Sequence, residues 1–180
     1  MKNVEFGLRL QGKPRKERED TAREYLSKVD LADFADAYPD ELSGGMQQRV
    51  AIARTLAMRR PIVLMDEPFG ALDAQTRADM QQMLIQLWEE EKNTIIFVTH
   101  DITEALLLAD RVIVFSPRPA RILRDMTVPF GPERPPGIVH KPEFVQCAEM
   151  LRQLLQKRRQ GEEPKVVPSA LPGGASDELQ

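Results

Sequence analysis

The stretch LSGGMQQR at residues 42–49 and the stretch IVLMDEP at residues 62–68 organise the rest of the chain. In the first, Ser43 can cap a helix, because its hydroxyl oxygen can accept a hydrogen bond from a free amide of the first turn. Gly44 and Gly45 leave the first-turn amides uncovered, so this helix start could bind an anion. A lone Ser-Gly-Gly is, however, also typical of an ordinary loop before an ordinary helix.

The second stretch predicts a strand that ends in two adjacent carboxylates. The apolar run Ile62–Met65 is typical of a parallel strand that is covered on both faces. It places Asp66 and Glu67 at the carboxyl end of the strand, where open α/β sheets bind ligands. Successive side chains of a strand point to opposite sides, so one carboxylate can hold Mg2+ while the other faces an attacking water. Taken alone, an Asp-Glu-Pro after a strand is equally typical of a solvated turn.

Further strands and helices are predicted downstream of these carboxylates. A helix with an apolar stripe follows Leu72, then a buried strand over Thr94–Val98 leads to His100, and a third strand covers Arg111–Phe115. This alternation predicts an α/β fold with one parallel sheet and right-handed crossovers. His100 would then lie at the same sheet edge as the two carboxylates. A neutral imidazole there can both donate and accept a hydrogen bond near a phosphate.

Together these motifs resemble those of the ATP-binding subunits of ABC transporters. The segment at 42–49 resembles the signature sequence, 62–68 the Walker B strand, 70–73 the D-loop, and 95–101 the strand that leads into the switch histidine. The turn SPRP at residues 116–119 is similar to the nitrate, sulfonate and taurine importer branch of the family. The resemblance implies a partial P-loop NTPase (ABC ATPase) fold: a parallel sheet with flanking helices, plus part of the helical subdomain.

The resemblance also implies a role for each matching residue at an ATP site shared by two subunits. Glu67 and His100 would be catalytic, with Glu67 orienting or deprotonating the attacking water and His100 contacting the γ-phosphate. Asp66 would help to hold Mg2+. The expected nucleotide-binding residues are Ser43, Gly44 and Gly45, which would bind the γ-phosphate of ATP held by the second subunit, and Asp73, which would communicate across the interface. Gln47 and Arg49 lie in the signature stretch without an assigned chemical role.

The segment GLRLQGKP at residues 7–14 matches all but the last position of the phosphate-binding loop GxxxxGK[ST], but we reject it. No apolar strand precedes Gly7, and Pro14 supplies neither a hydroxyl nor an N–H. No other GxxxxGK[ST] occurs in the sequence. We therefore expect the chain to correspond to the carboxy-terminal portion of a family member that lacks the Walker A and Q-loop region. We also expect no ATP hydrolysis by this chain alone, because no loop cradles the phosphates.

Two other functions remain open. The first is a non-catalytic half-site or regulatory fragment that acts with a complete subunit. The second is an ABC ATPase of DNA repair, which the net charge of −3 and the absence of long coiled-coil arms disfavour. For an importer, the expected partners are a second ATP-binding subunit, a transmembrane permease and, indirectly, a substrate-binding protein, without nucleic acid. The expected location is the cytoplasmic side of the membrane.

Composition is consistent with one domain of ordinary size. The 180 residues are enough for a single core, and the lone Cys147 excludes an intrachain disulfide. No apolar run approaches the roughly 18 residues of a membrane span. The expected divisions are residues 1–41 as part of the helical subdomain, 42–128 as the ABC ATPase core, 129–160 as a linker and C-terminal helix, and 161–180 as a disordered tail.

Overall fold

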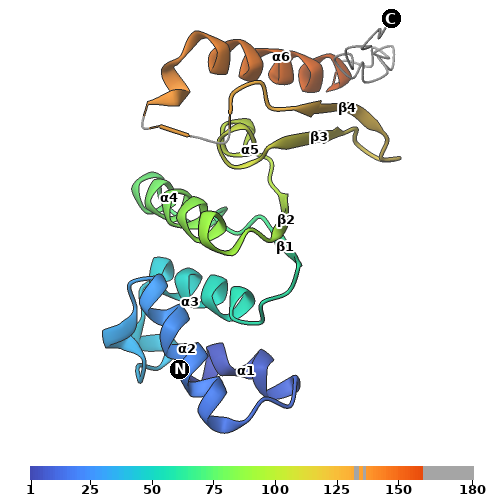
Figure 1. Cartoon of the computed structure of the whole chain (residues 1–180). Helices are drawn as coiled ribbons and strands as arrows, with labels where there is room; N and C mark the ends of the chain where they lie inside the picture. The colour runs from blue at the N-terminus through green and yellow to red at the C-terminus, as the bar shows by residue number, and fades with distance from the viewer. Residues whose placement is uncertain (132–133, 136, 160–180) are drawn as a thin grey trace, which may run out of the picture. The chain divides into compact units, whose positions relative to one another are not determined.

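A computed structural model describes residues 1–131, 134–135 and 137–159 of the chain. The chain forms two compact units, residues 1–100 and residues 101–180, which are described separately (Figure 1). The finer divisions at residues 41 and 128 stay predictions, and the expected disordered tail lies outside the described residues. Within the described part, no helix is long and apolar enough to span a bilayer.

The first unit begins with three helices that pack on one another: α1 (Lys2–Leu10), α2 (Arg15–Lys28) and α3 (Gly44–Leu56). The short 3-10 turns η1 (Ala32–Phe34) and η2 (Pro39–Glu41) connect α2 to α3. Gly7 lets α1 lie close to Met58, the second residue after α3, because a Cβ at position 7 would be only 2.6 Å from the Met58 sulfur. The helical layer therefore depends on a small residue inside α1.

The rejected phosphate-loop segment is part of this helical layer. Gly7 lies within α1, Gly12 turns the chain with a φ of 73°, and Pro14 directly precedes α2. A helix rather than a strand thus precedes the first glycine. The rejection of residues 7–14 as a phosphate-binding loop is confirmed.

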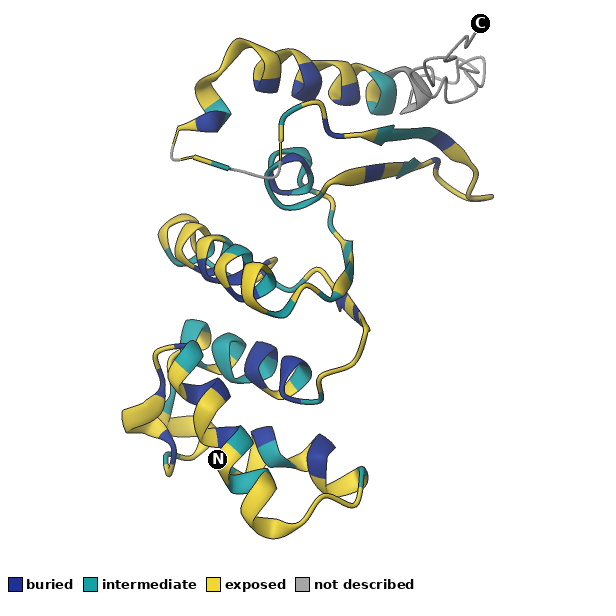
Figure 2. Cartoon of the chain, viewed as in Figure 1, coloured by how far each residue is buried: buried dark blue, intermediate teal, exposed yellow. Residues whose placement is uncertain are grey.

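The parallel sheet of the first unit contains β1 (Ile62–Asp66) and β2 (Thr94–Val98), joined through α4 (Ala74–Glu91) (Figure 1). The pairing register sets Asp66 opposite Val98. Buried and exposed residues alternate along β1 (Figure 2). Val63 and Met65 are 3% and 7% exposed, whereas Leu64 is 71% exposed.

The expectation that Ile62–Met65 is covered on both faces is therefore wrong. A two-stranded parallel sheet with a single crossover helix can bury only one of its faces. The other face of the β1–β2 sheet is apolar and exposed; it consists of Ile62, Leu64, Ile96 and Val98. We call this set the bare sheet face.

The second unit contains α5 (Ile102–Leu108), β3 (Arg111–Phe115), β4 (Ile122–Thr127), the 3-10 turn η3 (Ile138–His140) and α6 (Pro142–Arg159). The expected third parallel strand, β3, pairs antiparallel with β4 instead. Residues 116–121 join the two strands, so this pairing needs no crossover helix and closes only a short loop. The Ser116 hydroxyl holds the turn by accepting a hydrogen bond from the Arg121 amide at 2.9 Å.

A hydrophobic cluster holds the second unit together. Its members come from α5, β3, η3 and α6 and from the segment after β4; they are Leu106, Val112, Val128, Ile138, Phe144, Cys147, Ala148 and Leu151. The guanidinium of Arg134 donates to the carbonyl oxygens of Leu107, Ala109 and Phe130 at 3.0 to 3.2 Å. Burial raises the pKa of the Cys147 thiol, which therefore behaves as a small apolar side chain.

The bare sheet face leads to a testable contrast between neighbouring residues of β1. Leu64→Thr should change the free energy of unfolding by less than about 0.5 kcal/mol, because the side chain is exposed. Met65→Thr should cost about 2–5 kcal/mol, because it leaves a cavity and buries a hydroxyl. Urea unfolding followed by circular dichroism measures both, and light scattering should show less self-association for Leu64→Thr. Equal destabilisation by the two variants would mean that the bare sheet face is covered in solution.

Candidate functional site

The carboxyl ends of β1 and β2 bring Glu67 and His100 into contact. Glu67 directly follows β1, and its amide continues the sheet pairing by donating to the Val98 carbonyl at 2.9 Å. His100 lies two residues beyond Val98, and its Nδ1 is 3.2 Å from the Glu67 Oε2. The His100 side chain is 76% exposed, and the Glu67 side chain is 52% exposed. A carboxylate that can accept a proton and an imidazole that can both donate and accept a hydrogen bond thus share one open sheet edge.

The backbone at Glu67 is held in a strained conformation. Its φ is 44°, in the left-handed region that non-glycine residues avoid. A turn follows, in which Gly70 donates to the Glu67 carbonyl and Leu72 donates to that of Phe69, each at 3.2 Å. Phe69 is buried, and its ring centroid lies 5.8 Å from that of Phe97 in β2. The buried ring and the turn together keep the Glu67 carboxylate at the sheet edge despite the strain.

Asp73 is the N-cap of α4. Its carboxylate accepts hydrogen bonds from the amides of Gln75 and Thr76 at 3.1 and 3.0 Å, and from the Thr76 hydroxyl at 2.7 Å. The hydrogen bonds from the Thr76 amide and hydroxyl lower the pKa of Asp73 below its ordinary value. Asp73 is therefore a charged cap that fixes the start of α4. Its expected role across a subunit interface stays a prediction.

Ser43 caps α3, as the sequence predicts. Its Oγ accepts a hydrogen bond from the Met46 amide at 3.3 Å. A Cβ built on Gly44 would meet no atom within 4 Å, so the first turn is open at this point. A Cβ on Gly45 would lie 2.8 Å from the Thr76 Cγ2, so glycine permits this approach of α3 to α4 without a shift of the Thr76 side chain. The starts of α3 and α4 thus lie against each other.

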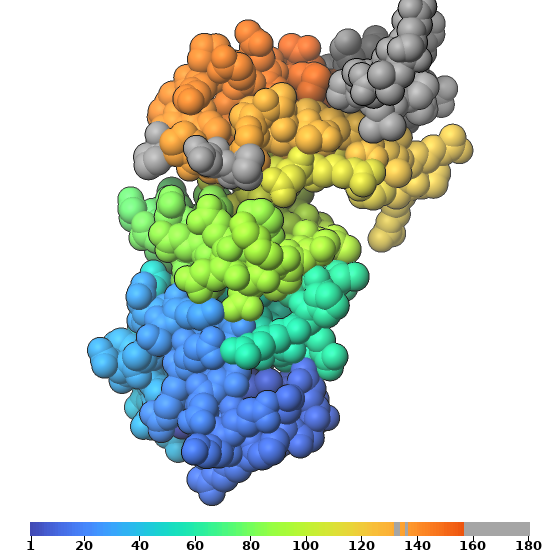
Figure 3. Space-filling view, in the orientation of Figure 1, coloured from blue at the N-terminus to red at the C-terminus, as the bar shows by residue number. Residues whose placement is uncertain are grey.

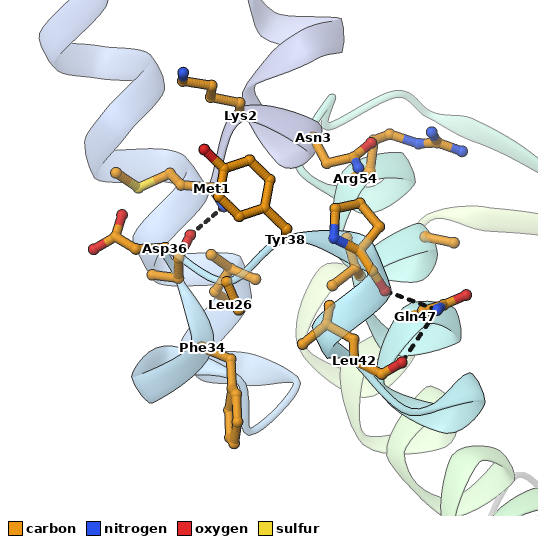
Figure 4. A pocket seen from close by; sticks show the side chains of 15 residues that line it. Met1, Lys2, Asn3, Leu26, Phe34, Asp36, Tyr38, Leu42, Gln47 and Arg54 are labelled. Atoms are coloured by element: carbon orange, nitrogen blue, oxygen red, sulfur yellow. Dashed lines mark hydrogen bonds between the residues drawn. The ribbon is translucent and has the colours of Figure 1, made fainter.

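Gln47 and Arg49 hold the signature stretch in place, a role that the sequence reasoning missed. The Gln47 side chain donates to the Pro39 and Leu42 carbonyls at 2.8 and 3.1 Å (Figure 4). Arg49 donates to the Val29 carbonyl at 3.0 Å. The only sign of this role in the sequence is that Gln47 and Arg49 are polar residues near the start of a helix. Their partners lie up to twenty residues away, and no local pattern identifies them.

A hollow of about 470 Å³ opens beside the signature stretch, between α1, the segment that connects α2 to α3, and α3 itself (Figure 4). Its lining includes Asn3, Tyr38, Leu42 and Arg54. The amino group of Met1 donates to the Ala35 carbonyl at its edge. None of the predicted site residues lines this hollow, so it is separate from the sheet edge.

Asp66 is the last residue of β1 and is exposed. Among the described residues, no group of three or more metal-binding side chains forms a cation site. Mg2+ commonly uses one or two protein carboxylates and takes its other ligands from phosphates and water. Asp66 can supply one such carboxylate.

Comparisons with known proteins agree with these motifs. Residues 2–70 match the family model described as ABC transporter. The nitrate import ATP-binding protein NrtD of Synechocystis sp. is 49% identical over 173 residues, which are 93% of this chain and 65% of that protein. The taurine import ATP-binding protein TauB of Chromobacterium violaceum is 48% identical over 154 residues, 83% of this chain and 59% of that protein. The chain thus spans less than two thirds of the length of each relative.

A solved structure described as a metal-chelate type ABC transporter in an inward-facing conformation also resembles the chain. The TM-score is 0.61 at 26% sequence identity, and the match covers 67% of this chain and 49% of that chain. The parallel β1–β2 pair with its flanking helices is therefore part of an ABC ATPase fold of the P-loop NTPase class.

The strain at Glu67 predicts an inverted preference between glycine and alanine. Glu67→Gly should be about 1 kcal/mol more stable than Glu67→Ala, because glycine adopts a positive φ without a steric penalty. The matched control is Gln82, an exposed residue in the middle of α4, where the alanine variant should be more stable than the glycine variant by about 1 kcal/mol. Urea unfolding measures all four. The same order at both positions would show that Glu67 is not strained.

Proposed function

The chain belongs to the ABC transporter family, and we propose that it acts as an ATP-binding subunit of an importer for a small anion or organosulfonate. The contact between Glu67 and His100 carries the proposal. It supports ATP chemistry because a carboxylate that can accept a proton from water lies beside a side chain that can contact a phosphate oxygen.

We assign the roles at this site as follows. Glu67 orients or deprotonates the attacking water, and His100 contacts the γ-phosphate. Asp66 helps to hold Mg2+, which would supply charge stabilisation to the phosphates when bound. The start of α3, with Ser43, Gly44 and Gly45, would contact the γ-phosphate of ATP on a second subunit through its open amides, and Asp73 would communicate across that interface.

The substrate class and the partners are proposed from the relatives. Nitrate and taurine appear in the names of the two relatives, and both molecules are small and carry an anionic group. The partners would be a second ATP-binding subunit, a transmembrane permease that contains the transport path and, indirectly, a substrate-binding protein. The chain would lie at the cytoplasmic face of the membrane, bound through the permease.

A specific observation favours a second candidate, the non-catalytic half-site. The 180 residues contain a complete signature stretch but no GxxxxGK[ST] loop. The lysine and backbone amides of that loop cradle the phosphates in P-loop enzymes. We therefore propose that the chain by itself does not hydrolyse ATP, and that its Ser43 to Gly45 segment can serve ATP bound to a complete subunit.

A chimera tests the catalytic assignment. The part of Synechocystis NrtD that lies outside the match is fused ahead of this chain, and phosphate release from Mg-ATP is measured for the chimera and for the chain alone. The chimera should hydrolyse ATP and the chain alone should not. Glu67→Gln should lower the rate of the chimera by at least about 100-fold, the usual contribution of a general base. The control Glu89→Gln removes an exposed carboxylate from α4 and should leave the rate unchanged.

Two outcomes would contradict this assignment. An ATP-hydrolysing chimera whose rate is unaffected by Glu67→Gln would remove Glu67 from the chemistry. Turnover by the 180-residue chain alone, abolished by Glu67→Gln, would contradict the proposed dependence on a phosphate-binding loop.

A mixing experiment tests whether the chain can act as a non-catalytic half-site. The chain is added to Chromobacterium TauB in which the signature serine is replaced by arginine, and ATP turnover is measured. Restored turnover that is lost with Ser43→Arg in this chain but kept with Glu67→Gln would support the half-site. No restoration by the folded chain would contradict it.

A further inference from the structure

A polar cluster ties the end of α4 to α2. The Glu91 Oε1 accepts hydrogen bonds from the Tyr25 hydroxyl and from the Lys28 ammonium, each at 2.8 Å. The Lys28 ammonium also lies 3.1 Å from the Glu90 Oε2. Tyr25 is fully buried, and the Lys28 and Glu91 side chains are 23% and 18% exposed. We call Tyr25, Lys28, Glu90 and Glu91 the α2–α4 clamp.

The charges of the clamp are stabilised by their neighbours. Burial alone would lower the pKa of Lys28, but its hydrogen bonds to Glu91 and Glu90 raise that pKa. Burial alone would raise the pKa of Glu91, but hydrogen bonds from Lys28 and Tyr25 lower it. Both groups are therefore charged at neutral pH, and partly buried charge-assisted hydrogen bonds are stronger than those between exposed partners.

The end of α3 joins the same cluster through Arg59. Its guanidinium pairs with Glu24 of α2 at 2.8 Å and lies 5.8 Å from the centre of the Tyr25 ring. The Lys28 ammonium lies 5.0 Å from the same ring. The Tyr25 side chain thus contacts groups from α2, from the residues after α3 and from α4. These three parts of the first unit are fixed to one another at this point.

The opposite end of α4 contacts the start of α3. Gly45 lies against the Thr76 methyl group, within the first turn that Asp73 caps. α4 has 18 residues and contains neither glycine nor proline, so it is a stiff rod about 27 Å long. Figure 3 shows its surface, in green, against the blue and teal surface of the α2 and α3 region. The contact between Gly45 and the Thr76 methyl group is apolar, as is the buried face of α4 at Met80, Leu84 and Leu87, whereas the clamp at the far end is polar and directional.

We propose that Tyr25 and Lys28 are positioning residues: by clamping the end of α4 they fix the distance between the start of α3, at Ser43 to Gly45, and the start of α4, at Asp73. A stiff helix held at one end by directional bonds carries that restraint to its other end, whereas the apolar contacts along α4 are not directional. The use of this spacing for ATP binding rests on the proposed function. The restraint itself does not, and it can be measured without nucleotide.

The test measures the distance between spin labels on the two helix starts in the full chain without ATP. Labels are attached at Asp40→Cys, just before the signature stretch, and at Ala78→Cys on α4, both exposed, in a Cys147→Ser background. Lys28→Met and Glu91→Gln should each shift or widen the distance distribution by about 1–2 Å, the size of helix displacements at repacked interfaces. Lys28→Arg keeps a cationic hydrogen-bond donor at this position and should therefore give the same distribution as the unchanged clamp.

The matched control is Lys13→Met. Lys13 pairs with Glu17 at 2.7 Å, but this exposed pair joins only the start of α2 to the preceding turn, so its loss should leave the distribution unchanged. If Lys28→Met does not fold, Tyr25→Phe removes only one hydroxyl from the clamp and should give the same shift in a folded chain. Unchanged distributions in Tyr25→Phe and Glu91→Gln, even with lowered thermal stability, would overturn the proposal and reduce the clamp to a stabilising contact.

Discussion

The parallel pairing of β1 with β2 is the constraint on which the candidate site depends. The register sets Asp66 opposite Val98, so the residues that leave the two strands emerge at the same edge. The Glu67 amide extends this pairing by one hydrogen bond, and the Glu67 carboxylate meets His100 only because of it. A shift of one residue would turn these side chains to opposite faces of the sheet. The chemistry proposed for this edge is thus a consequence of backbone hydrogen bonding.

Sequence patterns predicted the features that follow from residue type and spacing along the chain. The cap at Ser43, the helix after Leu72, the parallel β1–β2 pair and the non-phosphate nature of residues 7–14 were all identified from spacing and residue type. The pairing of β3 was missed, because an apolar strand carries no signal that distinguishes a parallel neighbour from a hairpin partner. The placement of Glu67 and His100 at one sheet edge could be predicted, because each follows the end of an apolar run and an apolar run marks the extent of a strand.

Contacts that depend on how one helix packs against another could not be predicted. Tyr25 and Glu91 are separated by 66 positions, and Arg49 reaches Val29 across 20. Each of these residues resembles any surface or core residue of its helix, and only the packing of one helix on another selects the partner. The same applies to Gly45, whose need for a small side chain arises from Thr76 of another helix. The signature stretch revealed a candidate site, but not the groups that hold it.

The exposure of the sheet edge limits how strongly Glu67 and His100 can stabilise charge. More than half of the Glu67 side chain and three quarters of the His100 side chain are open to solvent. In water, a carboxylate and an imidazole stabilise a developing charge only weakly, because the high dielectric screens them. Electrostatic catalysis requires the same groups in a site from which water is excluded.

The bare sheet face and the open edge belong to the same two strands, so whatever covers this sheet would act on both. A second protein surface placed over the bare sheet face and the open edge would bury apolar surface and desolvate the Glu67–His100 pair together, so on the proposed function this burial and the chemistry would be coupled.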